Sequence, residues 1–175
     1  LVKAMTGCWA VISAVTYSVN VQVTRAAIEA GVHLCDLGGN NDVVRRQVGL
    51  DSEAKARGIT ILPNCGLAPG LINILAVSGA KQFDEIDSIH LRVGGLPQHP
   101  RPPLNYQIVF SVEGLINEYV EPAEAIRDGQ VKRIDSMAEL ESIRFPEPFG
   151  ELEAFTTSGG LSTLTQYFSG KVKNL

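Results

Sequence analysis

Short apolar runs alternate with helical patterns over the first third of the chain. Residues 10–15 form a short apolar run rich in β-branched residues, as a strand buried on both faces does, and residues 32–37 and 59–62 are predicted as a second and a third short strand. Apolar residues recur at helical spacing over 20–30, where Asn20 is a favoured N-cap, and again over 43–54. Strands joined in this way by helices predict right-handed crossovers and a parallel sheet.

The pattern changes after residue 80. Residues 87–93 and 106–110 alternate polar and apolar side chains, which is typical of half-exposed strands. Asp128-Gly129 separates two strand-like runs and predicts a tight hairpin. The other predicted elements are helices at 71–80, 111–119 and 161–168 and strands at 143–145 and 152–155. The second half is therefore expected to be α+β with largely antiparallel pairing.

Composition is typical of a folded protein and argues against several partners. The 175 residues are 45% hydrophobic and 19% charged, with 17 Gly and 9 Pro. A net charge of −4 without a basic cluster argues against a nucleic-acid partner. The apolar runs are too short for a membrane-spanning helix, which needs about 20 residues. Three distant cysteines, Cys8, Cys35 and Cys65, fit reduced thiols and predict a cytoplasmic protein.

Three loops are expected at one edge of the parallel sheet. In such sheets ligands bind outside the carboxyl ends of the strands, and the loops at 16–20, 36–40 and 64–70 follow the three predicted strands. Two of the loops are rich in glycine, which lets a ligand approach the backbone closely. The third leads into a helix whose free N–H groups would face the site. Each loop alone could be a simple turn or cap, but the three together favour a binding site.

The glycine fingerprint of a dinucleotide-binding fold is absent. That fingerprint is Gly-x-Gly-x-x-Gly after the first strand, and no two glycines of this chain are separated by a single residue. The three strands are therefore expected to be the later strands of such a sheet. The predicted fold class is α/β: the C-terminal part of a Rossmann-like parallel sheet, followed by an α+β, mostly antiparallel, substrate and dimerisation domain.

Several segments resemble the saccharopine dehydrogenase family, in the order in which that family carries them. The end of the family's nucleotide domain resembles VISAVTYSVNVQVTRAAIEAGVHLCDLGGN and NCGLAPGLINILA. The family's catalytic domain resembles VGGLPQHPRPPLNYQIVFSVEGLINEYVEPAEAIRDGQV and EAFTTSGG. Gly94-Gly95-Leu96-Pro97, the proline-rich loop and Tyr106 are most similar to the lysine 6-dehydrogenase branch. The resemblance covers nearly the whole chain.

The resemblance implies an NAD- or NADP-dependent oxidoreductase that acts on the C–N bond of a lysine-like amino acid. It implies that residues 1–80 are a partial dinucleotide-binding domain and that residues 81–175 are a catalytic and dimerisation domain, incomplete at its C-terminus. The family's first two strands and glycine fingerprint, expected before Leu1, are absent from this chain, and so is its Tyr-Pro-Gly-His segment, expected soon after Lys171. The isolated chain is therefore expected to be inactive, and the complete protein is expected to be a homo-oligomer.

The candidate catalytic residues are Asp36 and Tyr17. The Asp36 carboxylate could hold a substrate ammonium or handle a proton, but a turn or helix cap explains Asp36 equally well, and simple packing explains Tyr17. Cofactor-binding residues are expected at the end of the first strand and in the Gly-x-x-Pro-Gly turn: Ala14, Val15, Thr16, Gly66, Pro69 and Gly70. Substrate-binding residues are expected in the second half: Gly94, Gly95, Leu96, Pro97 and Tyr106.

Other residues give weaker signals. Arg92 and Arg101 could each bind a substrate carboxylate, and His99, in the proline-rich loop, is a candidate acid-base group. The histidines and cysteines lack the spacing of metal ligands, so no metal site is expected. Cys65 lies in a site loop, but no neighbour in the sequence suggests an activated thiolate.

Two alternatives to the oxidoreductase stay open. One is a non-catalytic dimerisation or ligand-binding module, because a sheet without its first strands exposes an edge that can pair with another chain. The other is an unrelated small α/β binding protein. An amino acid is the expected small-molecule partner, and neither nucleic acid nor a membrane is expected.

Overall fold

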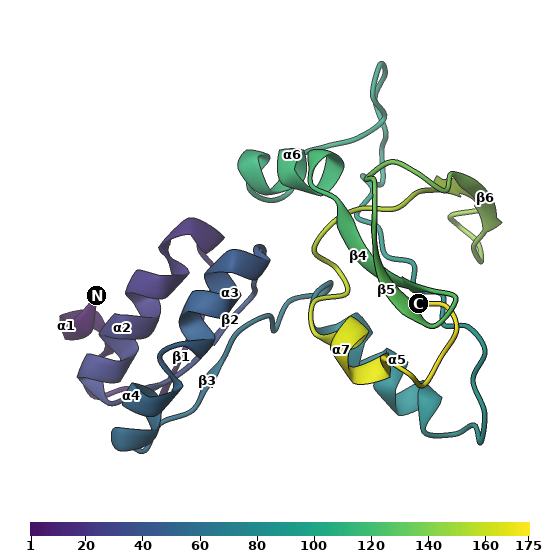
Figure 1. The fold of residues 1–175 in the computed structure, drawn as a ribbon. Helices are drawn as coiled ribbons and strands as arrows, with labels where there is room; N and C mark the ends of the chain where they lie inside the picture. The colour runs from purple at the N-terminus through teal and green to yellow at the C-terminus, as the bar shows by residue number, and fades with distance from the viewer. The chain divides into compact units, whose positions relative to one another are not determined.

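The structure, a computed structural model, describes residues 1–175 and divides into two compact units, residues 1–74 and 75–175 (Figure 1). The boundary falls inside helix α5 (Leu71–Ala80). Each unit has its own β-structure and its own buried apolar cluster, so each can be described by itself.

The first unit is a three-stranded parallel sheet with helical crossovers. Strand β2 pairs in parallel with both neighbours, which gives the order β1-β2-β3 and confirms the predicted parallel sheet. Its elements, in chain order, are α1 (Val2–Met5), β1 (Ala10–Ser13), the 3-10 helix η1 (Tyr17–Val19), α2 (Asn20–Ala30), β2 (His33–Asp36), α3 (Asn41–Val48), α4 (Asp51–Ala56) and β3 (Ile61–Leu62).

Only one face of this sheet packs against helices. Leu34 of β2 is 2% exposed and lies in a cluster with apolar residues of α2, and Val11 and Ile61 pack against the same cluster. On the opposite face, Ile12 is 72% exposed and Leu62 is 53% exposed. The prediction that the first strand is buried on both faces is therefore wrong, because side chains alternate along a strand and the crossover helices cover one face.

Polar residues and glycines mark some of the helix ends in the first unit: α2 ends at Gly31 and α3 at Gly49. Asn40 caps α3, since its side chain accepts hydrogen bonds from the N–H groups of Asp42 and Val43. Asn20 does not act as the predicted N-cap: it lies inside α2 and is buried. The helix predicted over 43–54 is two helices, α3 and α4. At the break, Leu50, only 6% exposed, packs in a second apolar cluster with Ile28, Ala54 and Ile59.

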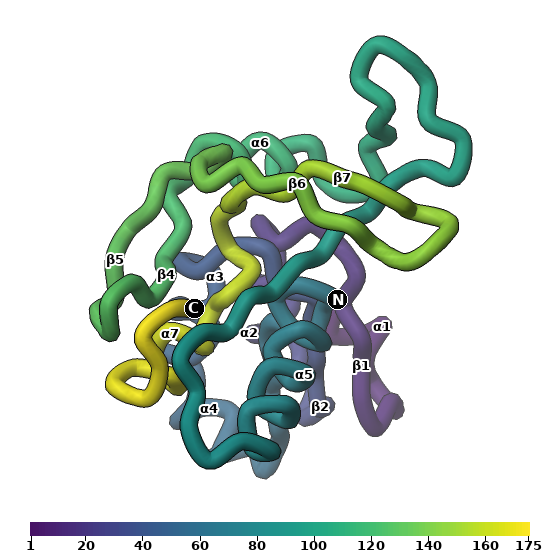
Figure 2. Tube along the Cα trace, turned by 90° about the vertical axis from the view of Figure 1, so that its right-hand side faces the viewer, coloured from purple at the N-terminus to yellow at the C-terminus, as the bar shows by residue number.

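The second unit contains two separate hairpins and three helices. Its elements, after α5, are α6 (Val112–Val120), β4 (Ala123–Arg127), β5 (Gln130–Ile134), β6 (Glu141–Arg144), β7 (Glu151–Ala154) and α7 (Leu164–Phe168). β4 pairs antiparallel with β5, and β6 runs beside β7 in the same way (Figure 2). The β4–β5 turn has φ of 55° at Asp128 and 76° at Gly129, so the predicted hairpin is confirmed. No helix in either unit has the length and apolar character that crossing a membrane requires.

The core of the second unit is centred on Ile126 of β4, which is 0% exposed. Ile126 exchanges two backbone hydrogen bonds of 3.0 Å with Leu175, so the last residues of the chain run along β4. Ala76 of α5 and Leu164 and Phe168 of α7 complete the cluster. The antiparallel hairpin is therefore packed against two helices from distant parts of this unit.

Two predicted strands of the second unit are wrong. In 87–93 only a single bridge forms, between Ser88 and Asn174, with Ile89 N–H donating to the Asn174 carbonyl at 3.0 Å. Residues 106–110 form no strand and belong to a long segment before α6 that extends away from the rest of the unit (Figures 1 and 2). An alternating pattern is not enough for a strand, because a strand also needs a neighbouring backbone to bond, and here even Val93, Ile108 and Phe110 are exposed.

Ile126 and its cross-strand neighbour Val131 provide a matched test of this core. We expect Ile126→Ala to lower the free energy of unfolding by about 2–5 kcal/mol, because it leaves a cavity in a fully buried position. Val131 is 50% exposed, so Val131→Ala should cost only about 0.5 kcal/mol. Denaturant midpoints followed by circular dichroism measure both. Equal losses would contradict the packing described here.

Candidate functional site

The three loops at the carboxyl edge of the parallel sheet contact one another. A Cβ added to Gly39 would lie 3.1 Å from Cδ1 of Tyr17, and one added to Gly38 would lie 2.1 Å from Oδ1 of Asn64. Cys65 N–H donates to the carbonyl of Asp36 at 2.7 Å. The ends of β1, β2 and β3 therefore form one continuous surface, as their parallel order requires.

The buried carboxylate of Asp36 connects the second and third of these loops through hydrogen bonds. It is fully buried at 0% exposure. Its Oδ1 accepts from the N–H groups of Gly38 at 2.8 Å and Asn64 at 3.4 Å, and its Oδ2 accepts from Nε2 of Gln47 at 2.6 Å. All of these partners belong to the protein, so in this conformation Asp36 acts as a turn-forming group, the second of the two roles that the sequence left open.

Gln47 belongs to a chain of buried polar groups that fixes the direction of its amide. Thr24 Oγ1 donates to the Asn20 carbonyl at 2.8 Å, so that oxygen can only accept from Gln47 Nε2 at 2.9 Å. The same Nε2 donates to Asp36, which therefore accepts at both oxygens. Ser13 Oγ donates to Oδ1 of Asn20 at 3.4 Å. The Oε1 atom of Gln47 is buried and has no hydrogen-bond partner.

The turn that precedes α5 is shaped by two close backbone contacts. A Cβ on Gly66 would lie 2.6 Å from the carbonyl oxygen of Leu37, and one on Gly70 would lie 2.1 Å from the carbonyl oxygen of Gly66. Gly70 also has φ of 138°, which L side chains rarely adopt. Pro69, between them, is buried. These three residues therefore contribute backbone geometry, whatever ligand the edge binds.

The N-terminus of α5 does not present free N–H groups, contrary to the sequence prediction. Leu71 N–H donates to the Gly66 carbonyl and Ile72 N–H to the Leu67 carbonyl, at 2.9 and 3.0 Å. The N–H of Gly70 donates to Oδ1 of Asn73 at 2.7 Å. The tight turn folds back over the helix end and satisfies the donors that a phosphate would otherwise find there.

Exposed side chains line the outer side of this edge. Ala14, Val15 and Thr16, at the end of β1, are all exposed, whereas Tyr17 is only 9% exposed. Cys65 is exposed, and partial burial, followed by the nearby Cys35 thiol and the Asp36 carboxylate, raises its pKa. A raised pKa disfavours the thiolate, so the geometry gives no activated nucleophile here.

The predicted substrate residues lie in the second unit. Gly94, Gly95 and Leu96 are exposed and Pro97 is half-buried. Tyr106 is half-buried, whereas its neighbours over 101–110 are exposed.

The other polar candidates fall into two groups. Arg92 is paired with Glu141, so its guanidinium is already engaged. His99 and Arg101 are exposed.

Sequence reasoning missed two polar residues on helices. Gln47 lies four residues, about one helical turn, after the buried Val43. Both residues therefore lie on the inner face of the helix that Asn40 caps, and this spacing is the signal that could have found Gln47. Glu118, on α6, is half-buried, and burial raises the pKa of its carboxyl. No hydrophobic pattern marks Glu118, because its position follows only from the packing of α6.

No group of three or more His, Cys, Asp or Glu side chains could hold a metal ion. A shallow hollow of about 740 Å³ lies in the second unit between α5 and residues 170–173, lined mostly by apolar atoms. Lys171 closes one side, 4.0 Å above the ring of Tyr167. The hollow contains none of the predicted site residues, and its chemistry does not specify a ligand.

Comparison with known proteins identifies the family. Residues 66–174 match the family model described as the saccharopine dehydrogenase C-terminal domain. The chain belongs to the saccharopine dehydrogenase family, which confirms the resemblance read from its motifs.

Two individual relatives match this chain at 28% and 27% identity. The mouse protein named alpha-aminoadipic semialdehyde synthase, mitochondrial, is 28% identical over 130 residues, which is 71% of this chain and 14% of the relative. The Pyricularia oryzae saccharopine dehydrogenase [NADP(+), L-glutamate-forming] is 27% identical over 133 residues, 71% of this chain and 28% of the relative. The chain thus spans a small part of these curated relatives.

A solved structure shares the fold. The apo saccharopine dehydrogenase (L-Glu forming) from Saccharomyces cerevisiae superposes with a TM-score of 0.70 at 20% identity, covering 99% of this chain and 40% of that one. At this identity the likeness concerns the fold alone. It supports a mixed α/β chain with one parallel sheet and antiparallel hairpins.

Asp36→Asn tests whether the buried carboxylate holds the loops together. One oxygen becomes an NH₂ group, which must face either Gly38 N–H or Gln47 Nε2, and both are donors. We expect a loss of about 1–3 kcal/mol in the free energy of unfolding. The control Asp42→Asn alters a side chain that is 77% exposed and should change stability by less than about 0.5 kcal/mol. An Asp36→Asn chain as stable as the parent would contradict this role.

The stability of Glu118→Gln should depend on pH. Burial raises the pKa of Glu118 in the fold, so its ionised form is disfavoured there relative to the unfolded chain. Protonated Glu118 contributes stability below the pKa that it has in the unfolded chain. This contribution is lost as the pH rises through its higher pKa in the folded chain. Glu118→Gln should therefore raise the melting temperature at neutral pH, and the gain should vanish in acid. Glu113→Gln, at an exposed position of α6, is the control, and a destabilised Glu118→Gln chain at neutral pH would refute the assignment.

Proposed function

We propose that this chain is part of an NAD- or NADP-dependent oxidoreductase that acts on the C–N bond of a lysine-like amino acid. The family match over residues 66–174 is the observation that carries the proposal. Two curated relatives support the chemistry through their names, which refer to aminoadipic semialdehyde and to saccharopine and NADP. In this proposal residues 1–80 belong to a Rossmann-like domain and residues 81–175 to a catalytic and dimerisation domain.

The residues present suit one end of a nicotinamide dinucleotide. The chain has no Gly-x-Gly-x-x-Gly and no free N–H groups at the α5 N-terminus, so it offers no cradle for the pyrophosphate. It does offer an exposed strand end at Ala14, Val15 and Thr16, and a turn whose Gly66 and Gly70 have no side chains. These residues would orient the nicotinamide half, and NAD(P) supplies the hydride-transfer chemistry when bound.

Asp36 and Tyr17 take positioning roles in this proposal. Asp36 ties the Gly38 turn and the loop after β3 to α3, and so sets the shape of the edge. Tyr17 packs against Gly39 and supports that turn. A direct proton-handling role for Asp36 stays a prediction, because reaching substrate would require it to exchange its present partners. Gly94, Gly95, Leu96, Pro97 and Tyr106 are the proposed substrate contacts.

The full-length gene product should be purified and assayed with L-lysine and saccharopine against NAD⁺ and NADP⁺. We expect NAD(P)H absorbance to rise with one amino acid and one cofactor. No turnover with either amino acid, and no cofactor binding by calorimetry, would overturn the proposal. The isolated chain should bind NAD weakly, because it has no cradle for the pyrophosphate. Tight binding of NAD by these residues alone would contradict that statement.

Gly70→Ala and Gly79→Ala test whether the turn before α5 contributes to cofactor binding. Gly70→Ala adds a Cβ that would lie 2.1 Å from the Gly66 carbonyl oxygen, at a residue whose φ is positive, and so distorts the turn. We expect it to weaken cofactor affinity at least tenfold. The second adds a Cβ with no atom within 4 Å, near the end of the same helix. It should leave affinity unchanged and stabilise the helix by up to about 1 kcal/mol. Equal affinities in both variants would exclude the turn from the site.

A non-catalytic association module is a second candidate, favoured by the exposed edge of the first unit. β1 lies at the edge of the sheet, Trp9 beside it is 81% exposed, and no charged residue interrupts its strand. Such an edge favours pairing with another copy, in line with the predicted homo-oligomer. Light scattering across a concentration series should show a dimer, and a monomer throughout would remove this candidate.

The cellular compartment stays a prediction. The three cysteines are free thiols in the structure, which suits the cytoplasmic location that the sequence favours. The mouse relative carries the word mitochondrial in its name, so localisation of the tagged full-length protein is the deciding observation.

A further inference from the structure

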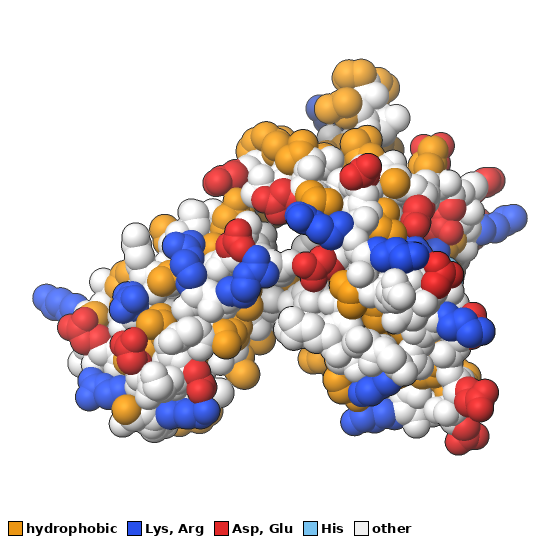
Figure 3. All heavy atoms as spheres, in the orientation of Figure 1, with side chains coloured by type: hydrophobic (Ala, Val, Ile, Leu, Met, Phe, Trp, Pro, Cys, Tyr) orange, Lys and Arg blue, Asp and Glu red, His pale blue; other side chains and the backbone are white.

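Helix α6 exposes an apolar stripe. Val112, Ile116 and Val120 follow one another at intervals of four residues, so they lie on one face of the helix. They are 55%, 53% and 68% exposed. Figure 3 shows hydrophobic side chains gathered over α6 and at the projecting end of the loop that precedes it. An exposed apolar surface of this kind marks an interaction site.

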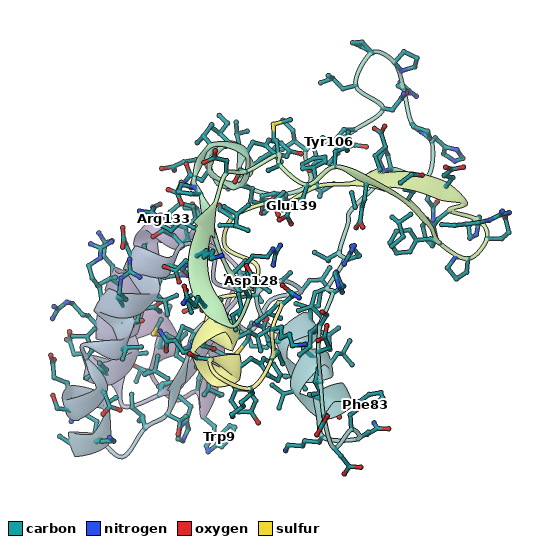
Figure 4. The ribbon with its side chains drawn as sticks, turned by 45° about the vertical axis from the view of Figure 1, so that its right-hand side comes forward. Trp9, Phe83, Tyr106, Asp128, Arg133 and Glu139 are labelled. Carbon is teal, nitrogen blue, oxygen red and sulfur yellow. The ribbon has the colours of Figure 1, made fainter.

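The loop before α6, residues 95–109, stands away from the rest of the second unit (Figures 2 and 4). Its two limbs approach each other at the base, where a Cβ added to Gly95 would lie 3.9 Å from Cγ2 of Val109. At its tip, the N–H of Asn105 donates to the Arg101 carbonyl at 3.0 Å. Residues 95–109 therefore form an arm that folds back on itself and closes at its tip.

The arm is stiff and exposes apolar side chains. Leu96, Leu104 and Val109 are 52%, 79% and 68% exposed. Proline fixes φ and so restricts the backbone, and the arm contains Pro97, Pro100, Pro102 and Pro103. A stiff segment loses little conformational entropy on binding, so these apolar side chains can be buried against a partner at a small entropic cost.

The arm and α6 carry opposite charges. Residues 94–110 contain Arg101 and no Asp or Glu, whereas residues 111–122 contain three glutamates and no Lys or Arg. Glu113 and Glu121 are exposed at the two ends of the apolar stripe, and Arg101 is exposed near the tip of the arm. The two surfaces are therefore complementary in charge, and both are apolar.

Within one copy, the tip of the arm does not cover the stripe. Phe110 connects the arm to α6, and its ring packs on the first turn of the helix, since a Cβ added to Gly114 would lie 3.5 Å from Cε2 of Phe110. Leu104 and Ile116 both remain exposed. A second copy presents the same two surfaces, and a two-fold axis would place each arm on the helix of the other copy, so that the contact forms twice.

We propose that the arm of one copy lies along helix α6 of a second copy, in a symmetric dimer that exchanges both arms. Leu104 contacts the apolar stripe of the partner, and Arg101 pairs with the glutamates that flank it. This interface lies in the second unit and depends neither on the proposed dehydrogenase activity nor on the edge of β1.

Charge reversal tests the exchange in the 175-residue chain. The arm variant is Arg101→Glu, and the helix variant combines Glu113→Lys with Glu121→Lys. Each variant alone places like charges at both contacts of its own dimer, so we expect its dimer dissociation constant to rise at least about tenfold. An equimolar mixture restores opposite charges at both contacts and should dimerise as the parent does. Sedimentation equilibrium measures all four samples.

Three outcomes of that experiment would overturn the inference: a monomeric parent chain, variants as dimeric as the parent, or a mixture no more dimeric than its components. Pairing of α6 with α6, or of β1 with β1, would leave the arm variant dimeric, so the second outcome also separates these interfaces from arm exchange.

Leu104→Ser and Leu140→Ser test the apolar part of the contact. Leu104→Ser removes an apolar side chain from both contacts and should raise the dimer dissociation constant at least about tenfold. Leu140 is 64% exposed and lies outside the arm and α6, so Leu140→Ser should leave the constant within about twofold of the parent. Both leucines are exposed, so both variants should keep the circular dichroism spectrum of the parent. Equal dissociation constants in the two variants would contradict the contact of Leu104 with the partner.

Discussion

A fully buried carboxylate determines the shape of the candidate cofactor edge. Asp36 is held without a cation by two backbone N–H groups and the amide of Gln47. Removing any of these donors would leave a charge partly unsatisfied in a region from which water is excluded, which is costly. The Gly38 turn, the loop after β3 and helix α3 are therefore fixed relative to one another. Asp36 has no contact with solvent, yet it determines the shape of the exposed edge of the parallel sheet.

Most of the first unit could be predicted because its signals are local. Asn40 caps a helix through its own side chain, and Gly31 ends α2 with φ of 70°. The strands followed from short apolar runs between such signals. The buried network of Asn20, Thr24 and Gln47 could not be predicted in the same way. Polar residues inside helices resemble surface residues in sequence, and only the packing of two helices reveals that they bond to each other.

The second unit was harder to predict because its pairings join distant segments. The Asp128-Gly129 hairpin was predicted from adjacent residues. Residues 87–93 were predicted as a strand, but they form one bridge with Asn174, which lies far along the chain. The alternating pattern therefore predicted neither the bonding of the backbone nor the exposure of Val93, which is 50% exposed. The same limit applies to Glu118, since Val112, Ile116 and Val120 of the same helix are exposed although they are apolar.

Two carboxylates of this chain illustrate how burial and pairing together determine a role. Asp36 is buried and satisfied at both oxygens, so exchanging its partners for a ligand would cost the contacts that hold three loops. Glu118 is half-buried and unpaired, so an incoming cation would relieve a desolvation cost already present in the fold. Both residues are acidic side chains in regular elements, and the sequence alone leaves Asp36 equally open to a substrate contact and to a turn-forming role. The hydrogen bonds of Asp36 favour the turn-forming role, so this buried carboxylate acts as the scaffold of the sheet edge.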